Sequence, residues 1–326
     1  MSLSIEAIGG YPSLELSKKN KAFHLGAFQY QSARAAFAAL LLNMPEVCRV
    51  WMPSYICDSM LAPIKFSGKE CIFYNISEKF DIATKIKLKK DDLLLYVNYF
   101  GVCETSVHRI LEKFNRQQVI VDCSQAFYAG PYDCLATIYS PRKFFGVPDG
   151  GLMMTNKNIV PPLEQDADSI LRMEHLITRL AFSAETGYAS YQRAEESLRN
   201  CSPKVMSELT KKLLAAIDYL DVQETRLKNF SLLHELLKEE NQFKFDMVSK
   251  APLCYPFMPK NKIDKKRLSE KRIFIPTYWP DVENRDGVNI FESDLVNRLI
   301  AIPCNQALDS ESDIYFIFEK IKGELL

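Results

Sequence analysis

Two neighbouring stretches decide the fold of this chain: VIVDCSQAFY at residues 119–128 and TIYSPRKFFGVPDGG at residues 137–151. Each begins with three β-branched or aromatic residues, which favour a short strand, and polar residues follow soon after. Asp122 ends the first strand, and Lys143 stands 21 residues later, just after the second. Because open α/β sheets bind ligands beyond the carboxyl ends of their strands, we expect Asp122 and Lys143 to converge at one edge of a sheet.

Similar apolar segments precede these two stretches and alternate with amphipathic ones. This alternation favours an α/β sheet whose strands are covered on both faces. We predict strands at 49–52, 71–74, 93–97, 119–121, 137–139 and 152–155. The Ala- and Leu-rich segment from Ala33 to Leu42 predicts a helix with Ser32 as its N-cap, and further helices are expected at 59–66 and 105–114.

The pattern changes from Leu163 onward. Apolar residues at 206, 209, 213, 217 and 220 step by three or four, which predicts one buried face of a long helix. Beyond prolines 252, 256 and 259, we predict a helix at 262–271, a strand at 272–275, an apolar run near 295–302 and a terminal helix at 312–326. The chain therefore divides into an N-terminal arm with a large domain, 1–225, and a small α+β domain, 226–326.

The composition excludes several classes of function. The 326 residues are 47% hydrophobic and 25% charged, as in globular proteins. Because 41 basic residues balance 41 acidic ones, no general field attracts nucleic acid or an anionic membrane. No stretch approaches the roughly 18 apolar residues of a membrane span. Nine scattered cysteines without a CxxC pair indicate the cytoplasm, and four histidines without ligand spacing predict no metal site.

An aspartate and a lysine at one sheet edge suit pyridoxal phosphate (PLP) chemistry. The lysine amine can form a Schiff base with the cofactor aldehyde, and the carboxylate can keep the pyridine nitrogen protonated. Ser32, Ala33 and Arg34 begin a predicted helix, whose free N–H groups and positive dipole end suit a phosphate. No dinucleotide, P-loop or hydrolase-elbow motif is present. Taken singly, Asp122 could end a turn, Lys143 could be a surface lysine and Ser32 a simple N-cap.

The order and spacing of these residues resemble the DegT/StrS family of PLP-dependent sugar-nucleotide aminotransferases, which have the aspartate aminotransferase fold type I. The resemblance runs from residues 8–11 through SARAA (32–36), PSYIC (53–57), NYFG (98–101) and DCSQ (122–125) to the terminal helix. Its most specific part is Lys143, followed six residues later by Asp149, Gly150 and Gly151. It implies a large three-layer α/β/α domain with a mostly parallel, seven-stranded sheet, and a small α+β C-terminal domain.

The resemblance also implies a role for each matching residue. Lys143 would form the internal aldimine with PLP and then move the substrate proton. Asp122 would pair with the pyridinium nitrogen, and Gln125 would hydrogen-bond the ring hydroxyl. Residues 32–34 would lie near the cofactor phosphate, with Ser140 as a further phosphate hydroxyl.

Four positions depart from the family pattern. Cys57 stands where a ring-stacking aromatic falls, and Asn98 replaces a histidine, so these two become the cofactor-binding candidates there. The family commonly places a phosphate-binding serine five residues before its active lysine, where this chain has Ile138. An asparagine on a long loop from the neighbouring subunit corresponds to residues 187–191, which include Ala189 and Ser190.

By resemblance, the chain would transfer an amino group from an amino acid, glutamate, to a nucleotide-linked keto sugar, for surface polysaccharide or related glycan biosynthesis. It would be a homodimer in which residues 187–193 cross into the neighbour. One alternative is a PLP-dependent sugar dehydratase, although relatives with that activity carry histidine in place of the lysine. The other is a catalytically silent or regulatory homologue that binds sugar nucleotides.

The acceptor class is predicted from the C-terminal arginines. Amino-acid aminotransferases of this fold usually hold the substrate carboxylate with a bidentate arginine of the C-terminal domain. No stretch around Arg267, Arg272, Arg285 or Arg298 resembles that clamp. We therefore expect a keto sugar, rather than a keto acid, as the amino acceptor.

Overall fold

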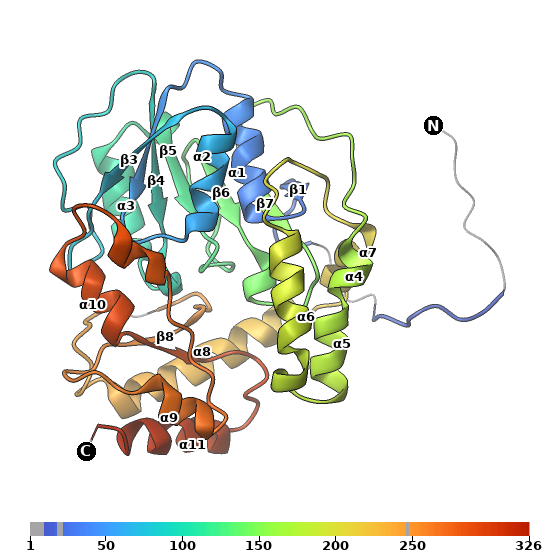
Figure 1. Cartoon of the computed structure of the whole chain (residues 1–326), viewed down its shortest axis with the longest axis vertical. Helices are drawn as coiled ribbons and strands as arrows, with labels where there is room; N and C mark the ends of the chain where they lie inside the picture. The colour runs from blue at the N-terminus through green and yellow to red at the C-terminus, as the bar shows by residue number, and fades with distance from the viewer. Residues whose placement is uncertain (1–9, 18–21, 246–247, 326) are drawn as a thin grey trace.

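A mostly parallel sheet forms the centre of the large domain in the computed structural model, which describes residues 10–17, 22–245 and 248–325 (Figure 1). In these ranges seven strands lie in the order β1-β7-β6-β5-β4-β2-β3. They are β1 (Phe28–Tyr30), β2 (Arg49–Pro53), β3 (Glu70–Tyr74), β4 (Asp92–Val97), β5 (Val119–Asp122), β6 (Ala136–Tyr139) and β7 (Gly151–Met154). Strands β2 to β6 pair in parallel, whereas β7 runs antiparallel to β1 and β6. The seven-stranded sheet is confirmed.

Helices of the large domain cover this sheet and connect its strands. Every residue of β4 and β5 is buried, so both faces are covered, as their apolar sequences predict. Helix α1 (Ala33–Leu42) has the predicted bounds, and the Ser32 hydroxyl accepts a hydrogen bond from the Ala35 N–H at 3.2 Å. In the described residues before 160, the other α-helices are α2 (Ala62–Phe66) and α3 (Glu104–Lys113).

The later part of the chain is mainly helical. Its elements are α4 (Ser169–Arg172), α5 (Glu174–Ala181), α6 (Ala184–Ser197), α7 (Glu208–Ala215), α8 (Tyr219–Leu237), β8 (Cys254–Phe257), α9 (Lys265–Glu270), α10 (Ile290–Arg298), β9 (Ile300–Pro303) and α11 (Glu311–Lys322). Helices α5 and α6 form a hairpin beside the sheet, and β8 pairs antiparallel with β9 in the small domain (Figure 1).

Helix α8 belongs to both hydrophobic cores. Tyr219 and Val222, in its first turn, pack into the core of the large domain. Phe230 and Leu233, further along, pack into the small-domain core with β8, β9 and α11. The proposed domain boundary at 225/226 falls inside this helix and stays a prediction.

The long helix predicted across residues 206–220 is wrong. The chain forms α7 and α8 there, and Leu220 is 70% exposed, so the apolar residues do not share one buried face. A side-chain cap explains the break: the Asp218 carboxylate accepts a hydrogen bond from the Asp221 N–H at 3.2 Å and starts a new helix.

Two further predictions of local structure need correction. The strand expected at 272–275 pairs with no strand in the described ranges, because the N–H groups of Arg272 and Ile273 bond back to carbonyls of α9. Residues 187–193 lie inside helix α6 rather than in a crossing loop. The apolar run near 295–302 divides between α10 and β9.

Three of the observed strands, β1, β8 and β9, were not predicted. Strand β1 has three residues, too few for a period to show in the sequence. Strand β8 contains Pro256, which argues against a strand in the middle of a sheet but is tolerated here, where β8 pairs with β9 in a two-stranded sheet. Residues 8 and 9, where the family resemblance begins, lie outside the described residues.

Candidate active site

The strand register brings the predicted site residues to one edge of the sheet. Asp122 at the end of β5 lies opposite Val97 at the end of β4 and opposite Ile138 in β6. Strand β7 begins at this edge because it runs antiparallel to β6, and Ser32 forms a bridge with Gly150 just before it. The expected convergence of Asp122, Lys143 and the start of α1 therefore has a direct cause in the topology.

Lys143 ends a short 3₁₀ helix, η4 (Pro141–Lys143), that follows β6. Its side chain is exposed and makes no hydrogen bond or ion pair to any residue that the structure describes. Burial raises the pKa of the Cys254 thiol well above its usual range, and the positive charges of Arg226 and Lys143 act in the opposite direction. The Lys143 amine thus lies near β8 and is free to react.

Asp122 is a buried carboxylate, 3% exposed, with no cationic partner among the described residues. Its Oδ1 accepts a hydrogen bond from the Ser124 N–H at 2.8 Å. The structure assigns no donor to Oδ2 within the described ranges. A buried carboxylate is costly unless it is paired, so this site suits a ligand that carries a positive charge.

Gln125 presents an unpartnered donor at the same edge. Its Oε1 accepts a hydrogen bond from the Phe100 N–H at 2.8 Å, which fixes the orientation of the amide. Its Nε2 is buried and has no partner within the described chain. The turn after β4 approaches closely because Gly101, at a φ of 80°, has no Cβ, which would lie 2.8 Å from the Gln125 carbonyl oxygen. An acceptor on a bound ligand would satisfy the Gln125 amide.

The start of helix α1 packs directly on the two glycines that precede and begin β7. The Gly150 N–H donates to the Gln31 carbonyl at 2.8 Å. A Cβ at Gly151 would overlap the carbonyl group of Ser32 and the amide nitrogen of Ala33. Only glycine allows this approach. It holds the first N–H groups of α1 at the edge of the sheet where Asp122 lies, which we call the active edge, and there they can bind a phosphate.

Replacing Gly151 with Ala is therefore expected to destabilise the fold strongly. Overpacking a rigid backbone contact typically costs about 1–3 kcal/mol, and here the neighbouring atoms belong to the main chain and cannot rotate away. Thermal unfolding of the purified variant measures the effect. Gly130→Ala is the matched control, since a Cβ at Gly130 meets no atom within 4 Å. Equal melting temperatures for both variants would contradict the tight packing of α1 on β7.

Two arginines add positive charge near this helix start. Arg142 forms an ion pair with Glu195 of α6, whereas half-buried Arg34 has no ion pair or hydrogen bond to a described residue. Burial lowers the pKa of the Arg34 guanidinium, and Arg142 acts in the same direction, while Cys57 and Glu195 oppose the shift. Arg34 is thus a desolvated cation close to Cys57 and Arg142, and an anion at this position would be bound favourably.

Comparison with known proteins supports the same fold. No family model matches the chain, and no curated protein matches it by sequence. A DegT DnrJ EryC1 StrS aminotransferase from Brucella abortus is 17% identical, with 91% of this chain and 85% of that chain covered and a TM-score of 0.60. The sugar aminotransferase CalS13 from Micromonospora echinospora is 17% identical, covering 91% and 87%, at 0.61. PseC, an aminotransferase from Helicobacter pylori, is 14% identical, covering 96% and 93%, at 0.59.

This chain has their fold. The expected fold-type I architecture is thereby confirmed. The similarity extends over nearly the whole length of this chain, including the small domain, and over most of the length of each neighbour. At 14–17% identity the similarity establishes the architecture, and the roles of single residues rest on the geometry described above.

Cys57 and Asn98, two of the positions that depart from the family pattern, follow strands β2 and β4. The Cys57 thiol accepts a hydrogen bond from the Ser59 hydroxyl at 3.0 Å and lies close enough to Arg34 to affect its pKa. Asn98 uses its side chain within the protein: its Oδ1 accepts from the Cys103 N–H at 3.1 Å, and its Nδ2 donates to the Tyr132 hydroxyl at 3.2 Å. Asn98 therefore shapes the turn after β4.

Ser140 and Ile138 occupy different environments at the end of β6. Ile138 is fully buried in the sheet and has no hydroxyl to offer a phosphate. Ser140 is also buried, but its hydroxyl makes no hydrogen bond to a described residue and remains available. Ser140 thus stays a predicted phosphate contact.

Asp149, in the motif that follows Lys143, has a structural role. Its carboxylate accepts hydrogen bonds from the Ser207 N–H and hydroxyl, both at 2.9 Å, and from the Thr210 hydroxyl. Burial raises its pKa, and these hydrogen bonds act against that shift. Asp149 therefore joins the segment before β7 to the start of α7.

Arg226 is the residue near the site that sequence reasoning missed. It is 2% exposed, and its guanidinium donates to the carbonyls of Pro252, Leu253 and Phe144 at 3.1, 3.2 and 3.4 Å. Phe144 directly follows Lys143 in the chain. The signal was available, since residues 222, 226, 230 and 233 follow the buried stripe of α8 and place an arginine on its apolar face.

The described part of the chain has neither a candidate metal centre nor a candidate membrane-spanning helix. It contains no group of three or more His, Cys, Asp or Glu residues that could hold a metal ion. Its helices include none that is both long and apolar enough to cross a membrane.

Proposed function

We propose that this chain is a PLP-dependent aminotransferase that transfers an amino group from an amino acid, glutamate, to a nucleotide-linked keto sugar. The observation that carries the proposal is one sheet edge where, among the described residues, a lysine has no partner, a buried carboxylate has no cation and a buried amide has no acceptor. These are Lys143, Asp122 and Gln125. Their chemistry matches the aldehyde, the pyridine nitrogen and the ring hydroxyl of PLP, so the residues present fit the cofactor.

Each residue has a defined task in this proposal. When bound, PLP supplies an aldehyde that captures amines and a ring that withdraws electrons. Lys143 provides the amine that anchors the cofactor and then holds and moves the substrate proton at Nζ. Asp122 keeps a positive charge on the pyridine nitrogen, and Gln125 orients the ring. Ser32 and the Ala33 N–H bind the phosphate at the start of α1, with Arg34 and Ser140 beside them.

The sugar acceptor is supported by two observations. Several structures with this fold are described as sugar aminotransferases, and PseC is described as involved in pseudoaminic acid biosynthesis. In addition, the arginines beyond residue 260 are each ion-paired with a carboxylate, which leaves none unpaired for a substrate carboxylate. The pairs are Arg267–Glu324, Arg272–Glu185, Arg285–Asp58 and Arg298–Asp294. A role in surface polysaccharide or related glycan biosynthesis follows from this substrate class.

A panel of acceptors tests this function. The protein is loaded with pyridoxamine phosphate, and the return of pyridoxal phosphate absorbance is followed with nucleotide keto sugars and with simple keto acids. Rapid return with a nucleotide keto sugar is the expected result. Return with 2-oxoglutarate follows from the donor half-reaction and does not discriminate. Return with several other keto acids but no nucleotide sugar would contradict the sugar assignment.

Two further measurements distinguish the proposed function from its alternatives, a silent homologue and a sugar dehydratase. Borohydride reduction of the PLP-loaded protein should attach the cofactor irreversibly to the peptide that contains Lys143, as mass spectrometry would show. A protein that binds nucleotide sugars but not PLP would be a silent homologue. Release of water from a nucleotide sugar, without amino transfer, would indicate a dehydratase, although the presence of Lys143 argues against it.

We also propose a homodimer in the cytoplasm. The nine cysteines, all in the described ranges, are free thiols, in keeping with a reducing compartment. Apolar side chains are exposed on α4, α5 and the turn before α6, at 56% to 87% of their surface. They are Ile170, Leu171, Ile177, Leu180 and Phe182. Monomeric soluble proteins rarely expose a patch of this kind, and a second copy of the chain would cover it.

Sedimentation velocity at micromolar concentration is expected to give twice the 37.4 kDa mass of the chain. Leu180→Glu places a charge in the apolar patch and should shift the protein toward the monomer. Leu220→Glu changes a comparably exposed leucine on α8, outside the patch, and should leave the dimer intact. A wild-type protein that sediments only as a monomer with cofactor bound would exclude the dimer.

A further inference from the structure

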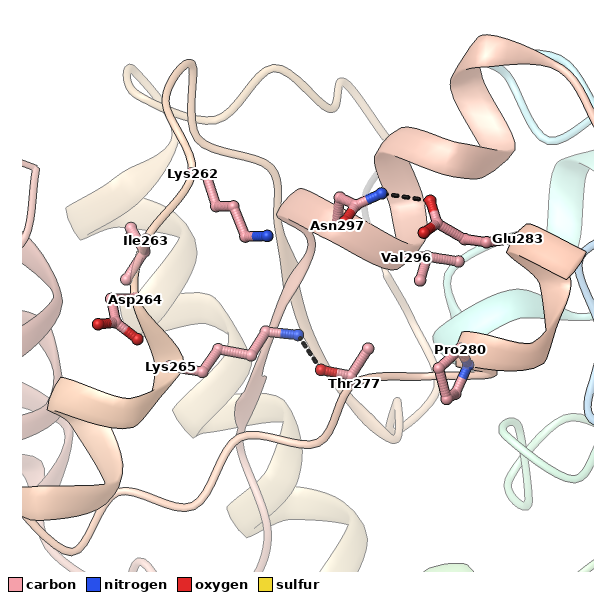
Figure 2. Close-up of a pocket in the computed structure, with 9 residues that line it drawn as sticks. All are labelled: Lys262, Ile263, Asp264, Lys265, Thr277, Pro280, Glu283, Val296 and Asn297. Atoms are coloured by element: carbon pink, nitrogen blue, oxygen red, sulfur yellow. Dashed lines mark hydrogen bonds between the residues drawn. The ribbon is translucent and has the colours of Figure 1, made fainter.

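A polar pocket lies in the small domain (Figure 2). It is bounded by the start of α9, by α10 and by the segment that leads into η5 (Pro280–Asn284). Its volume is about 560 Å³, which is within the range of small-molecule sites. None of the residues that line it belongs to the edge around Lys143. The pocket is therefore a separate feature, and the proposed reaction does not use it.

One wall of this pocket carries two lysines. Figure 2 shows the ammonium groups of Lys262 and Lys265 directed into the space, whereas the Asp264 side chain points away from it. Lys265 donates to the Pro276 carbonyl at 3.3 Å and to the Thr277 hydroxyl at 3.0 Å. In the part of the chain that the structure describes, neither lysine forms an ion pair, so this wall presents two ammonium groups to a ligand.

The pKa of Lys265 reflects its burial and the neighbouring charge of Lys262. Burial, and secondly the charge of Lys262, lower the pKa of Lys265 to about 8. Both causes disfavour the protonated amine. A bound anion would remove this penalty, because it supplies the missing negative charge to both ammonium groups.

The opposite wall offers acceptors. The Asn297 Nδ2 donates to the Glu283 carboxylate and to the Ser293 carbonyl, and the Ser293 hydroxyl donates to the same Glu283 oxygen at 2.8 Å. These contacts leave the Asn297 Oδ1 and the Glu283 Oε2 without a donor from any described residue. Because Glu283 is negative, this wall repels an anion and accepts hydrogen bonds from hydroxyl groups.

Two apolar residues, Ile263 and Val296, also line the pocket, and both are buried. Among the described residues that line the pocket, none is aromatic, so no ring can stack on a nucleobase. The pocket thus offers one anion-binding wall and one hydroxyl-binding wall.

We propose that this pocket binds a phosphorylated sugar, with the phosphate against Lys262 and Lys265 and the sugar hydroxyls against Asn297 and Glu283. The opposed charges of the two walls set the orientation of the ligand. Phosphate binding by lysine is a charge-assisted interaction, whereas the acceptor wall selects for the sugar. This assignment does not depend on amino transfer at Lys143.

Isothermal titration calorimetry of the protein saturated with PLP, whose phosphate would fill the proposed site at the start of α1, tests both walls with three probes. Glucose 1-phosphate should bind, inorganic phosphate should bind several-fold more weakly, and glucose alone should not bind at millimolar concentration. Equal affinities for glucose 1-phosphate and inorganic phosphate would overturn the assignment of the acceptor wall. The absence of binding by both would overturn the site.

Matched lysine variants locate the ligand. Lys265→Met should weaken glucose 1-phosphate binding at least about tenfold, as expected for loss of a hydrogen bond from a charged donor. Lys266→Met removes the same charge from an exposed position on α9 outside the pocket and should change the affinity less than twofold. Equal losses in the two variants would mean that the lysines act only through net charge, which would refute the pocket.

A second pair of variants separates this site from the one at Lys143. Lys143→Ala and Arg34→Ala should bind glucose 1-phosphate as the wild type does. Loss of binding in these variants, with binding retained in Lys265→Met, would place the ligand at the sheet edge and overturn the proposal. Failure of amino transfer leaves the calorimetric result unchanged, so the two proposals fail independently. Thermal unfolding of each variant confirms that it is folded.

Discussion

Replacing Lys143 with Ala is expected to abolish amino transfer and leave the fold intact. The loss should exceed about 10⁴-fold, because the lysine serves both as the covalent anchor and as the group that moves the substrate proton. The fold should persist, since the side chain is exposed and makes no hydrogen bond or ion pair within the described chain. Steady-state kinetics and thermal unfolding measure the two halves of this prediction.

Lys157→Ala is the matched control. Lys157 is an exposed lysine beyond the end of β7, away from the active edge, and its removal should change neither rate nor stability. A soluble Lys143→Ala protein with normal turnover would exclude the proposed mechanism. Loss of activity together with unfolding would instead assign Lys143 a structural role that its exposed position does not suggest.

The second large effect is expected for Asp122→Asn. The amide keeps the size of the carboxylate and can accept the hydrogen bond from the Ser124 N–H, so the variant should fold and bind the cofactor. It lacks the negative charge that would stabilise a protonated pyridine nitrogen. Loss of one well-placed electrostatic partner typically costs about 3 kcal/mol of transition-state stabilisation, so turnover should fall roughly 10²- to 10³-fold.

Asp133→Asn is the matched control, because it makes the same change of charge at a position outside the site. Asp133 is exposed and pairs only with exposed Arg116, and such surface pairs contribute little. Its variant should retain full activity. The test combines the turnover number with the absorption spectrum of the bound cofactor, which reports protonation of the ring. Equal turnover in Asp122→Asn and the wild type would contradict the assignment of Asp122.

At the proposed phosphate end of the site, we propose that charge takes the place of missing hydroxyl groups. The position five residues before Lys143 is held by buried Ile138, and the segment that includes Ala189 and Ser190 is part of helix α6. The polar groups that remain at this end are Ser32, Ser140 and the desolvated guanidinium of Arg34. A partially buried arginine is a strong phosphate ligand because it is always charged and presents a rigid fork of donors.

Much of the large domain could be predicted from the sequence because the information is local. Continuous apolar runs mark strands that are buried on both faces, and Ser32 before an Ala-rich segment marks the start of α1. The parallel order of the strands then brings Asp122 and Lys143 to one edge, as expected from their position after consecutive strands. These features follow from residues that are neighbours in the chain.

Other features depended on contacts between distant segments. Two contacts divide residues 206–220 into α7 and α8. Asp218 caps the start of α8, and Asp149, which precedes Ser207 by 58 residues, accepts a hydrogen bond from the Ser207 N–H at the start of α7. Strands β1 and β8 exist because a partner strand satisfies their backbone groups, not because three or four residues have a readable period. Local propensity cannot report such partners.

For this protein, the sequence by itself determined the fold class, the covering of the central strands and the placement of an aspartate and a lysine at one sheet edge. Those properties depend on hydrophobic period and on strand order. Only the tertiary structure decided that, among the described residues, the Gln125 amide lacks an acceptor and Arg34 is desolvated without a partner, and that Lys262 and Lys265 face a common pocket. Burial and the absence of a counter-charge are properties of the folded chain, because they are set by what packs around a residue rather than by its neighbours in sequence.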